Sequence, residues 1–327
     1  MLAVWYEKNG PAADVLHVGA RPTPQVGGGE VRVRLHASGV NPSDTKSRAG
    51  SRAVRWDYII PHSDGAGVID QVGEGVPADR LGERVWVWNG QWQRPLGTAA
   101  QYIVLPAAQA VALPQPVGFE EGACLGIPAM TAFHAVRLLG DVQGKSVLVT
   151  GGASGVGFYA AQMAQLQGAT VITTVGSAEK AAFLARAGLP DAILYKEGGV
   201  AAQVLDRTAG RGVDGVVDLD FSSTHELVSQ GAVAAHACVV AYGSNHREPV
   251  MLDFWAWLSR SIRLCPFLVY ELRPDERRAA IDAIGQWLQN GQLQHRVGKV
   301  WPLSDVVQAH EAVESGSVLG RVVLACP

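Results

Sequence analysis

The stretch SVLVTGGASGVGFYAAQMAQLQGATVITTVGSAEK, residues 146–180, is the part of the sequence that decides the fold. An apolar strand over 146–150 leads into the turn Gly152-Ala153-Ser154-Gly155-Val156-Gly157, and a helix is predicted over about 156–167. This is a GxGxxG spacing with Ser154 at the middle glycine. Gly152 allows the tight turn, the 154–155 backbone admits a pyrophosphate, and Gly157 lets helix and strand pack closely. The phosphates would face unpaired N–H groups at the positive end of the helix, so we predict a dinucleotide-binding turn.

The end of the second strand, predicted over 170–174, bears on the choice between NAD and NADP. An NAD site usually places Asp or Glu there, whereas residues 175–177 contain no carboxylate. Ser177 is predicted as a helix N-cap, which puts Lys180 in the first turn, where a cation is unfavourable unless it faces an anion such as a 2′-phosphate. Tyr195, at the end of the third strand, is predicted beside the adenine ribose. NADPH is therefore predicted, although Glu179 weakens the argument and Lys180 has the alternative of a solvated surface lysine.

The pattern outside this stretch indicates two domains in the 327-residue chain. Strands and helices alternate up to about residue 242, which is typical of an α/β fold with a doubly wound parallel sheet. The first 120 or so residues are mostly short strands separated by glycine, for example GEVRVRLHASGV with alternating apolar positions. We expect a mostly-β domain over 1–125 and a dinucleotide-binding domain over 126–267, with residues 268–327 completing the first.

Composition excludes several classes of function. The net charge of −3 provides no basic excess for binding phosphate backbones, so no nucleic acid partner is expected. No stretch approaches the ~18 apolar residues of a membrane span, and the N-terminus lacks the features of a signal peptide. The four cysteines are far apart and form no CxxC, as expected for packing residues or for free thiols in a reducing compartment. A cytoplasmic protein is predicted.

Several further motifs together resemble one family. They are GVNPSDTKSRAG (39–50), IPHSDGAGVIDQVGEGV (60–76), GIPAMTAFHAV (126–136), GGASGVG, TVGSAEK, AYGSN (241–245) and HEAVESGSVLGRVVL (310–324). With these motifs the whole chain resembles the zeta-crystallin-like quinone oxidoreductases of the medium-chain dehydrogenase/reductase superfamily.

The resemblance implies a GroES-like β domain, a Rossmann domain and an active site in the cleft between them. It also implies a homodimer or homotetramer formed through the edge strand of the Rossmann domain, here around SIRLCPFLV (261–269). Thr131 would contact the nicotinamide end of the cofactor. Further cofactor contacts would come from Tyr242, Gly243 and Ser244 under the dinucleotide and from Phe267 and Val269 beside the nicotinamide.

Zinc-using relatives carry GxCxxD and GHExxG, and these patterns fall on residues 39–44 and 62–67. Asn41 stands where the Cys ligand would be and Ser63 where the His ligand would be, so no metal is predicted. Without a Lewis acid the acceptor must already be electrophilic, as quinones and enones are. Asn41 is predicted to donate to a developing oxyanion, and Asp44 to orient the loop or take part in the site.

The favoured hypothesis is an NADPH-dependent quinone reductase. An NADPH-dependent reductase of enones or enals makes nearly the same demands on the sequence. A non-catalytic NADPH-binding structural or RNA-binding protein is a third hypothesis, which the intact dinucleotide turn disfavours. The cluster Trp86, Trp88 and Trp92 could line a flat aromatic pocket, although a place in the β-domain core is the simpler interpretation.

Overall fold

The computed structural model describes all 327 residues and divides into two compact units. Unit 1 comprises residues 1–127 and 281–327, and unit 2 comprises residues 128–280. The second limit falls inside the helix α10 (Pro274–Gln289), later than the limit expected after residue 267. Local hydrogen bonds explain this later limit. Arg277, in the second turn of α10, donates to the carbonyls of Val269, Tyr270 and Leu272, and these bonds hold the start of the helix against the preceding segment.

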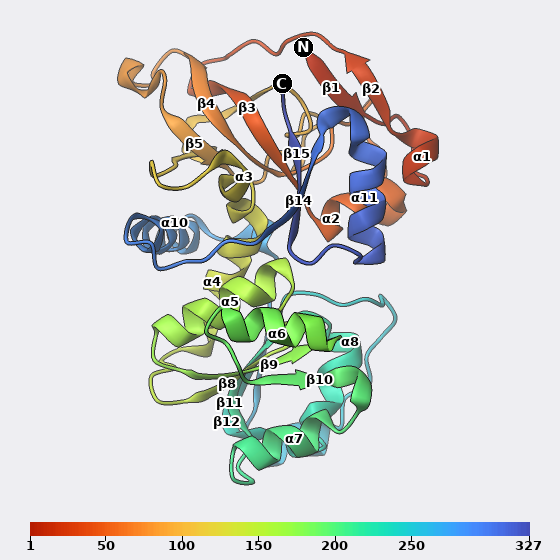
Figure 1. Cartoon of the computed structure of the whole chain (residues 1–327), viewed down its shortest axis with the longest axis vertical. Coiled ribbons are helices and arrows are strands. Elements are labelled where there is room, and N and C mark those ends of the chain that lie inside the picture. The colour runs from red at the N-terminus through yellow and green to blue at the C-terminus, as the bar shows by residue number, and fades with distance from the viewer. The chain divides into compact units, whose positions relative to one another are not determined.

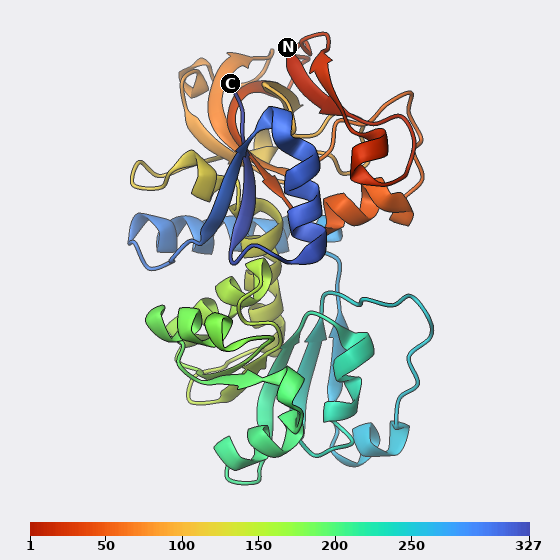
Figure 2. The ribbon, with the colours of Figure 1, turned by 45° about the vertical axis from the view of Figure 1, so that its right-hand side comes forward.

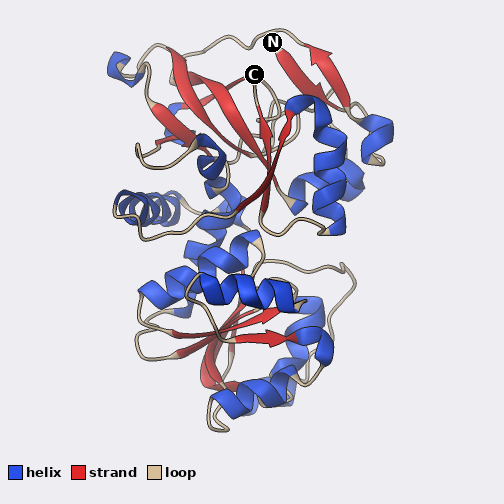
Figure 3. Ribbon diagram, viewed as in Figure 1, coloured by secondary structure: helices blue, strands red, loops and turns tan.

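Unit 2 contains a parallel sheet of six strands in the order β10-β9-β8-β11-β12-β13. Its strands are β8 (Ser146–Val149), β9 (Thr170–Val175), β10 (Ala192–Leu194), β11 (Val213–Asp218), β12 (Val233–Ala241) and β13 (Arg263–Pro266). Its helices are α4 (Met130–Leu139), α5 (Gly155–Leu166), α6 (Ala178–Arg186), α7 (Val200–Arg207), α8 (Phe221–Thr224) and α9 (Phe254–Ser259). Figure 3 shows helices on both faces of this sheet. The predicted doubly wound parallel sheet is confirmed.

Apolar strand residues explain why this sheet is buried on both faces. Leu148, Ile172 and Val216 belong to one cluster with Val204 of α7. The helix expected over about 224–230 is wrong in its extent, since α8 gives way to a single 3-10 turn over 225–227 and β12 begins soon afterwards.

Unit 1 is built around a mostly antiparallel sheet, with a two-stranded ribbon β1–β2 beside it. The main sheet has the order β14-β15-β3-β4-β5-β7, and β6 also pairs with β3. The strands are β1 (Leu2–Trp5), β2 (His17–Ala20), β3 (Glu30–Val40), β4 (Asp64–Val72), β5 (Arg84–Val87), β6 (Tyr102–Pro106), β7 (Ala110–Ala112), β14 (Val297–Pro302) and β15 (Arg321–Ala325). The predicted alternation in β3 is confirmed, because Val31, Val33, Leu35 and Ala37 are all buried.

The C-terminal segment returns to unit 1 and completes its sheet. β15 pairs with β3 in antiparallel register, with Val322 opposite Val40, and β14 pairs with β15 in parallel. Figure 2 shows these blue strands beside the orange strands of the N-terminal part. Both chain termini lie in this unit (Figure 1).

The remaining helices of unit 1 are short, apart from α11. They are α1 (Ala12–Val15), α2 (Pro42–Lys46), α3 (Phe119–Gly122) and α11 (Val306–Ser315). The single helical stretch expected over 120–139 is broken by a π-helical turn over 125–129 that contains Pro128, which cannot donate a helical hydrogen bond. None of the helices combines the length and the apolar character that a membrane crossing requires.

Candidate active site

The loop after β3 brings the two predicted catalytic residues together. Asn41 is the N-cap of α2, and Pro42 occupies the first helical position, where its missing N–H costs nothing. The Asn41 backbone N–H donates to the Asp44 carboxylate at 2.8 Å, which completes a capping box. Both side chains are buried, with 2% of Asn41 and 5% of Asp44 exposed. Asp44 therefore holds the loop in shape, as one of the two predicted roles requires.

The Asn41 side chain is held by two charged residues that the sequence did not single out as site residues. Its amide Nδ2 donates to Asp64 Oδ2 at 2.8 Å, and its Oδ1 accepts from Arg321 Nη2 at 2.6 Å. A guanidinium only donates and a carboxylate only accepts, so these partners fix which end of the amide is which. The sequence did contain a signal for Arg321, because this charged residue begins the otherwise apolar strand RVVLA. The structure shows that Arg321 is buried. Such a charge is almost never buried without a partner.

Burial makes the carboxyls of this network reluctant to ionise. Desolvation, with the repulsion of Asp64, raises the pKa of Asp44 to about 7. Desolvation raises the pKa of Asp64 to about 6, although Arg321 and the Asn41 amide act in the opposite direction. The pKa of Tyr6 rises to about 12 through burial and the nearby Asp44. Near neutral pH the pair of carboxyls is therefore poised to hold or release a proton.

A chain of buried hydrogen bonds runs from α11 to the backbone of Asp64. Thr98 Oγ1 donates to the Asp64 carbonyl at 2.7 Å, so it must accept from Ser38 Oγ, which lies 2.8 Å away. Ser38 has then used its only hydrogen and must accept from His62 Nδ1–H at 2.9 Å. The Nε2 of His62 is consequently an acceptor, and His310 donates to it from Nε2 at 2.9 Å.

These assignments make both histidines neutral structural groups. Burial lowers the pKa of His62 to about 3 and the pKa of His310 well below its ordinary value. His62 lies in a loop, as predicted, and has a left-handed backbone with φ of 76°. Its ring nitrogens are both occupied, which leaves none for a metal.

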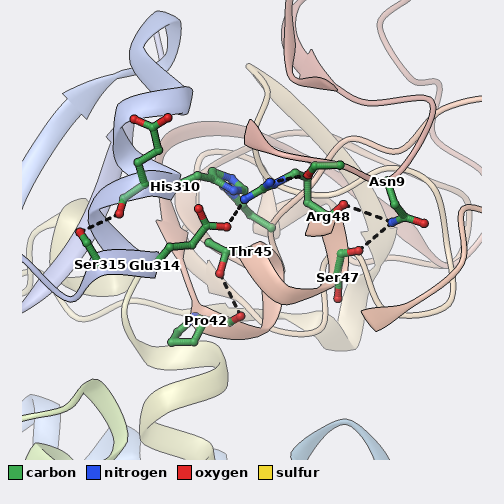
Figure 4. Close-up of polar contacts among 11 residues, drawn as sticks. Asn9, Pro42, Thr45, Ser47, Arg48, His310, Glu314 and Ser315 are labelled. Carbon is green, nitrogen blue, oxygen red and sulfur yellow. Dashed lines mark hydrogen bonds and ion pairs between the residues drawn. The ribbon is translucent and has the colours of Figure 1, made fainter. Parts of the chain in front are cut away.

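The other end of the Asn41 loop is anchored by α11, as Figure 4 shows. The Arg48 guanidinium is buried, pairs with the Glu314 carboxylate and donates to the Gly10 carbonyl at 2.5 Å. The Asn9 amide donates to the carbonyls of Ser47 and Arg48 at 2.9 and 3.2 Å. Glu314 and His310 project from the same helix toward Arg48 in this view.

The predicted dinucleotide turn of unit 2 exists, with one correction to its internal roles. The tight turn is made by Gly151, which has a left-handed φ of 63°, and not by Gly152. Gly152 serves close packing instead, since a Cβ there would lie 2.6 Å from the Thr173 side chain. Gly157 has the expected packing role, because a Cβ there would lie 2.3 Å from the Gly151 carbonyl oxygen.

The helix after this turn begins with groups suited to an anion. Ser154 is the N-cap of α5, and its hydroxyl accepts from the Gly157 N–H at 3.0 Å. The N–H groups of Gly155 and Val156 have no acceptor within the helix. With Ala153 in the turn before them, the backbone fits the phosphates of a dinucleotide.

The residues predicted at the adenosine end gather after β9 and β10. Ser177 is the N-cap of α6 and accepts from the Lys180 N–H at 3.4 Å, which puts Lys180 in the first turn. The Tyr195 ring lies against Gly176, where a Cβ would come 3.0 Å from the Tyr195 hydroxyl, and 49% of Tyr195 is exposed.

The residues predicted at the nicotinamide end lie on α4 and in the segment after β13, and His134, which the sequence did not single out, contacts one of them. Thr131 is buried on α4, and His134 lies three residues later on the same helix. The His134 ring meets Phe267 edge-on at 4.7 Å between centroids, and Val269 is also buried. His134 was detectable only by its spacing from Thr131.

The AYGSN segment follows β12 at the same end of the sheet. The Tyr242 N–H donates to the Asp218 carbonyl at 3.0 Å, and burial raises the pKa of the Tyr242 hydroxyl. Gly243 allows a close approach, because a Cβ there would lie 2.4 Å from the Leu219 carbonyl oxygen. The Ser244 hydroxyl donates to the His246 carbonyl at 2.8 Å, so it supports its own loop.

The tryptophan cluster divides between two environments. Trp86 is 1% exposed and belongs to the core of unit 1. Trp92 lies under the guanidinium of Arg52, 4.4 Å from its ring centroid. The core interpretation therefore holds for Trp86, and Trp92 stacks on a cation.

The donor set around Asn41 does not fit zinc. Asn41 and the buried Ser63 occupy the expected ligand positions, and neither supplies a thiolate or an imidazole. The Arg321 cation contacts Asn41 directly and would repel a divalent ion. No group of three or more His, Cys, Asp or Glu side chains is arranged to hold a metal anywhere in the 327 residues.

Comparisons with known proteins agree with both halves of this description. Residues 27–115 match the family model described as alcohol dehydrogenase GroES-like domain, and residues 187–324 match the model described as zinc-binding dehydrogenase. A quinone oxidoreductase of Pseudomonas aeruginosa is 30% identical over 310 residues, which cover 93% of this chain and 92% of that protein. The chain belongs to the quinone oxidoreductase family.

Two solved structures extend the comparison to the fold. An NAD-dependent alcohol dehydrogenase superposes with a TM-score of 0.89 at 29% identity and covers 99% of each chain. A mycobacterial protein solved as a complex with NADPH gives 0.87 at 28% identity, covering 99% of this chain and all of that one. The expected GroES-like and Rossmann folds of the medium-chain dehydrogenase/reductase superfamily are confirmed. This quinone oxidoreductase family member is thus an oxidoreductase that uses a nicotinamide cofactor on small-molecule substrates.

Proposed function

We propose that the enzyme reduces a quinone with NADPH and without zinc. The observation that carries the proposal is the Asn41 amide, held between Asp64 and Arg321 at the position where zinc-using relatives have a Cys ligand. An amide donor stabilises a developing oxyanion but cannot polarise an unreactive ketone as a metal does. The acceptor should therefore carry its own electrophilic character, and quinones have it.

The chain's own residues supply binding, charge stabilisation and a proton. The bound nicotinamide supplies the hydride. Of the two hydrogens on Asn41 Nδ2, one goes to Asp64, and the other, which also lies within reach of the Asp44 carboxyl, is the donor proposed for the quinone oxygen that gains charge. Reduction to the hydroquinone also consumes a proton, and burial that raises the pKa of Asp44 to about 7 suits this carboxyl to hold one at working pH.

The preference for NADPH is proposed from the α6 end of unit 2. Lys180 lies in the first turn of α6 behind the Ser177 cap, and Tyr195 borders the same loop. No carboxylate stands at residues 175–177 to accept from a ribose hydroxyl. A cation near a helix N-terminus is unfavourable by itself, but a 2′-phosphate facing it would stabilise it. One structural neighbour is NAD-dependent and the other was solved in complex with NADPH, so the preference rests on these residues.

We also propose that the enzyme forms at least a homodimer through β13. This strand is the edge of the unit 2 sheet, where unpaired backbone groups invite a second strand. Large apolar side chains before it are exposed, namely Met251 (88%), Phe254 (72%), Trp255 (72%) and Leu258 (52%). Sedimentation of the purified chain measures the oligomeric state directly, and a monomer would contradict this proposal.

A cytoplasmic location is part of the same proposal. All four cysteines are free, and Cys238 and Cys265 remain thiols although their sulfurs lie 3.5 Å apart. This pattern is usual in a reducing compartment. Fractionation of cells that express the tagged chain would locate it.

The test is NADPH oxidation, followed by absorbance, with 1,2- and 1,4-quinones and with a series of enones. NADH and a chelator are run alongside. We expect quinone turnover that prefers NADPH and does not respond to the chelator. Turnover of enones alone would replace the quinone by an enone or enal as the acceptor. Tight NADPH binding with no turnover of any acceptor would favour the non-catalytic alternative.

A further inference from the structure

We propose that Arg321 and Asp64 are positioning residues that set the orientation of the Asn41 amide and so fix the direction in which its second N–H points. This inference rests on the proposed function, because it assigns two partners to the residue that the function uses. Neither residue need touch the substrate. Their effect on turnover should therefore pass through Asn41.

The register of three adjacent strands carries the inference. β3 lies between β15 and β4 in the sheet. Val322 pairs with Val40, which puts Arg321 opposite Asn41 at the end of the ladder on one side. Gly39 pairs with Asp64 on the other side. A cation and an anion thus flank the amide from two neighbouring strands, and backbone pairing fixes the position of each.

Asp64 is itself held firmly. Its Oδ1 accepts from the Ile127 N–H at 2.8 Å while its Oδ2 accepts from Asn41. Gly126 leaves no space for movement, since a Cβ there would lie 2.3 Å from Asp64 Oδ1. The carbonyl of Asp64 is anchored by Thr98. The carboxylate can therefore impose its geometry on the amide.

The two bonds fix the direction of the second amide N–H, and the Asp44 carboxyl also lies within hydrogen-bond reach of the Asn41 side chain. Rotation of the amide by half a turn would place its NH₂ against the guanidinium and its oxygen against the carboxylate, which are two repulsive contacts in a buried site. The observed orientation is therefore the only one that satisfies both partners. The second hydrogen on Nδ2 then points in one fixed direction.

Arg321 also compensates the charge of the network. The groups around it are Asp64 and Asp44 from β4 and α2, Tyr6 beside Asp44, and Cys124, whose thiol faces Arg321 and Asp64. Removal of the cation leaves two buried carboxyls without a counter-ion. Their protonation should then persist to higher pH, and the pH profile of kcat should move in the alkaline direction.

Glu314 provides the matched control. It also reaches the Asn41 loop from the C-terminal segment, but it binds Arg48 at the far end and has no contact with the amide. A Glu314→Gln variant should affect the stability of the loop. It should not change the orientation of Asn41.

The experiment is a double-mutant cycle of Arg321→Lys and Arg321→Met with Asn41→Ala, using NADPH and the best quinone. We expect Asn41→Ala to lower kcat about 10²-fold, as removal of an oxyanion donor does. Arg321→Met should lower kcat to a similar extent and change the KM for NADPH less than about twofold. Arg321→Lys should have a kcat about tenfold higher than that of Arg321→Met. In the Asn41→Ala background both Arg321 variants should change kcat less than about twofold.

Additive losses in the cycle would overturn the inference, because they would show that Arg321 acts independently of Asn41. If Arg321→Met fails to fold, the Arg321→Lys arm carries the same test. If the wild-type enzyme does not turn over any quinone, it is the proposed function that fails and not this inference. The side-chain amide resonances of Asn41, identified by their loss in Asn41→Ala, then decide the inference. They should shift in Arg321→Lys and stay unchanged in Glu314→Gln, and the absence of a shift in Arg321→Lys would contradict it.

Discussion

The Asn41 network of unit 1 is buried and the dinucleotide turn of unit 2 is mostly half-buried, and the two regions obtain their polar groups differently. In the network, side chains from three distant segments meet, and the bond from Arg321 to Asn41 joins residues 280 positions apart. In the turn, residues 151–157 supply backbone N–H groups and empty space in one continuous stretch. The comparison indicates that the network depends on exact side-chain partners, whereas the turn depends on the absence of side chains.

The largest effect is expected from adding a single methyl group to the turn. In Gly157→Ala the new Cβ would lie 2.3 Å from the Gly151 carbonyl oxygen, so the backbone itself must shift. We expect NADPH affinity to fall about 10²- to 10³-fold, equivalent to about 3–4 kcal/mol. Isothermal titration measures this loss.

Gly285→Ala is the control for that substitution. Gly285 lies inside α10, and a Cβ there would meet nothing within 4 Å. This variant should bind NADPH normally and gain about 0.5–1 kcal/mol in its free energy of unfolding. Equal behaviour of the two variants would show that the turn does not depend on its missing side chain.

A smaller effect is expected from neutralising one carboxyl of the network. Burial raises the pKa of Asp44 to about 7, so the folded protein binds more protons than the unfolded chain between about pH 4 and pH 7. This residue therefore reduces stability progressively as the pH rises through that window. Asp44→Asn keeps an acceptor for the Asn41 N–H and removes the charge. Relative to wild type, we expect its gain in the free energy of unfolding to grow steadily as the pH rises from about 4 to about 7.

Denaturant unfolding at several pH values tests that gain. The exposed Asp79 is the control position, and Asp79→Asn should follow the wild-type curve at every pH. The buried histidines act in the opposite sense, since burial lowers the pKa of His62 to about 3, but both variants retain them. An Asp44→Asn curve parallel to wild type would mean that the carboxyl gains no proton on folding.

The smallest effect is expected from the one charged side chain assigned to the dinucleotide region. Lys180→Ala should weaken NADPH binding about three- to tenfold and leave NADH binding unchanged, because a partly exposed cation contributes modestly to phosphate binding. Lys196→Ala, in the 3-10 turn that begins with Tyr195, is the control. A loss shared equally by NADPH and NADH would remove Lys180 from the recognition of a 2′-phosphate.

The same difference explains what sequence reasoning could predict. The turn, its helix and the cap Ser177 follow from local spacing, and the tight turn was assigned to Gly152 although Gly151 makes it. Asn41 and Asp44 were named from the motif over residues 39–44, and the capping box that joins them is local as well. Asp64 and Arg321 were not, because their roles come from a strand register that pairs the end of the chain with its beginning.

The return of residues 281–327 to unit 1 has a consequence for the order in which the protein is made. Unit 2 is continuous in sequence, so all its residues are available once residue 280 has left the ribosome. At about 5–20 residues per second, residue 321 is added roughly 10–40 s after residue 127. During that interval the nascent N-terminal sheet lacks β15 and the only guanidinium that contacts the Asn41 amide. The Asn41 loop of unit 1 can therefore reach its final form only after residue 321 has been made, 280 positions after Asn41 itself.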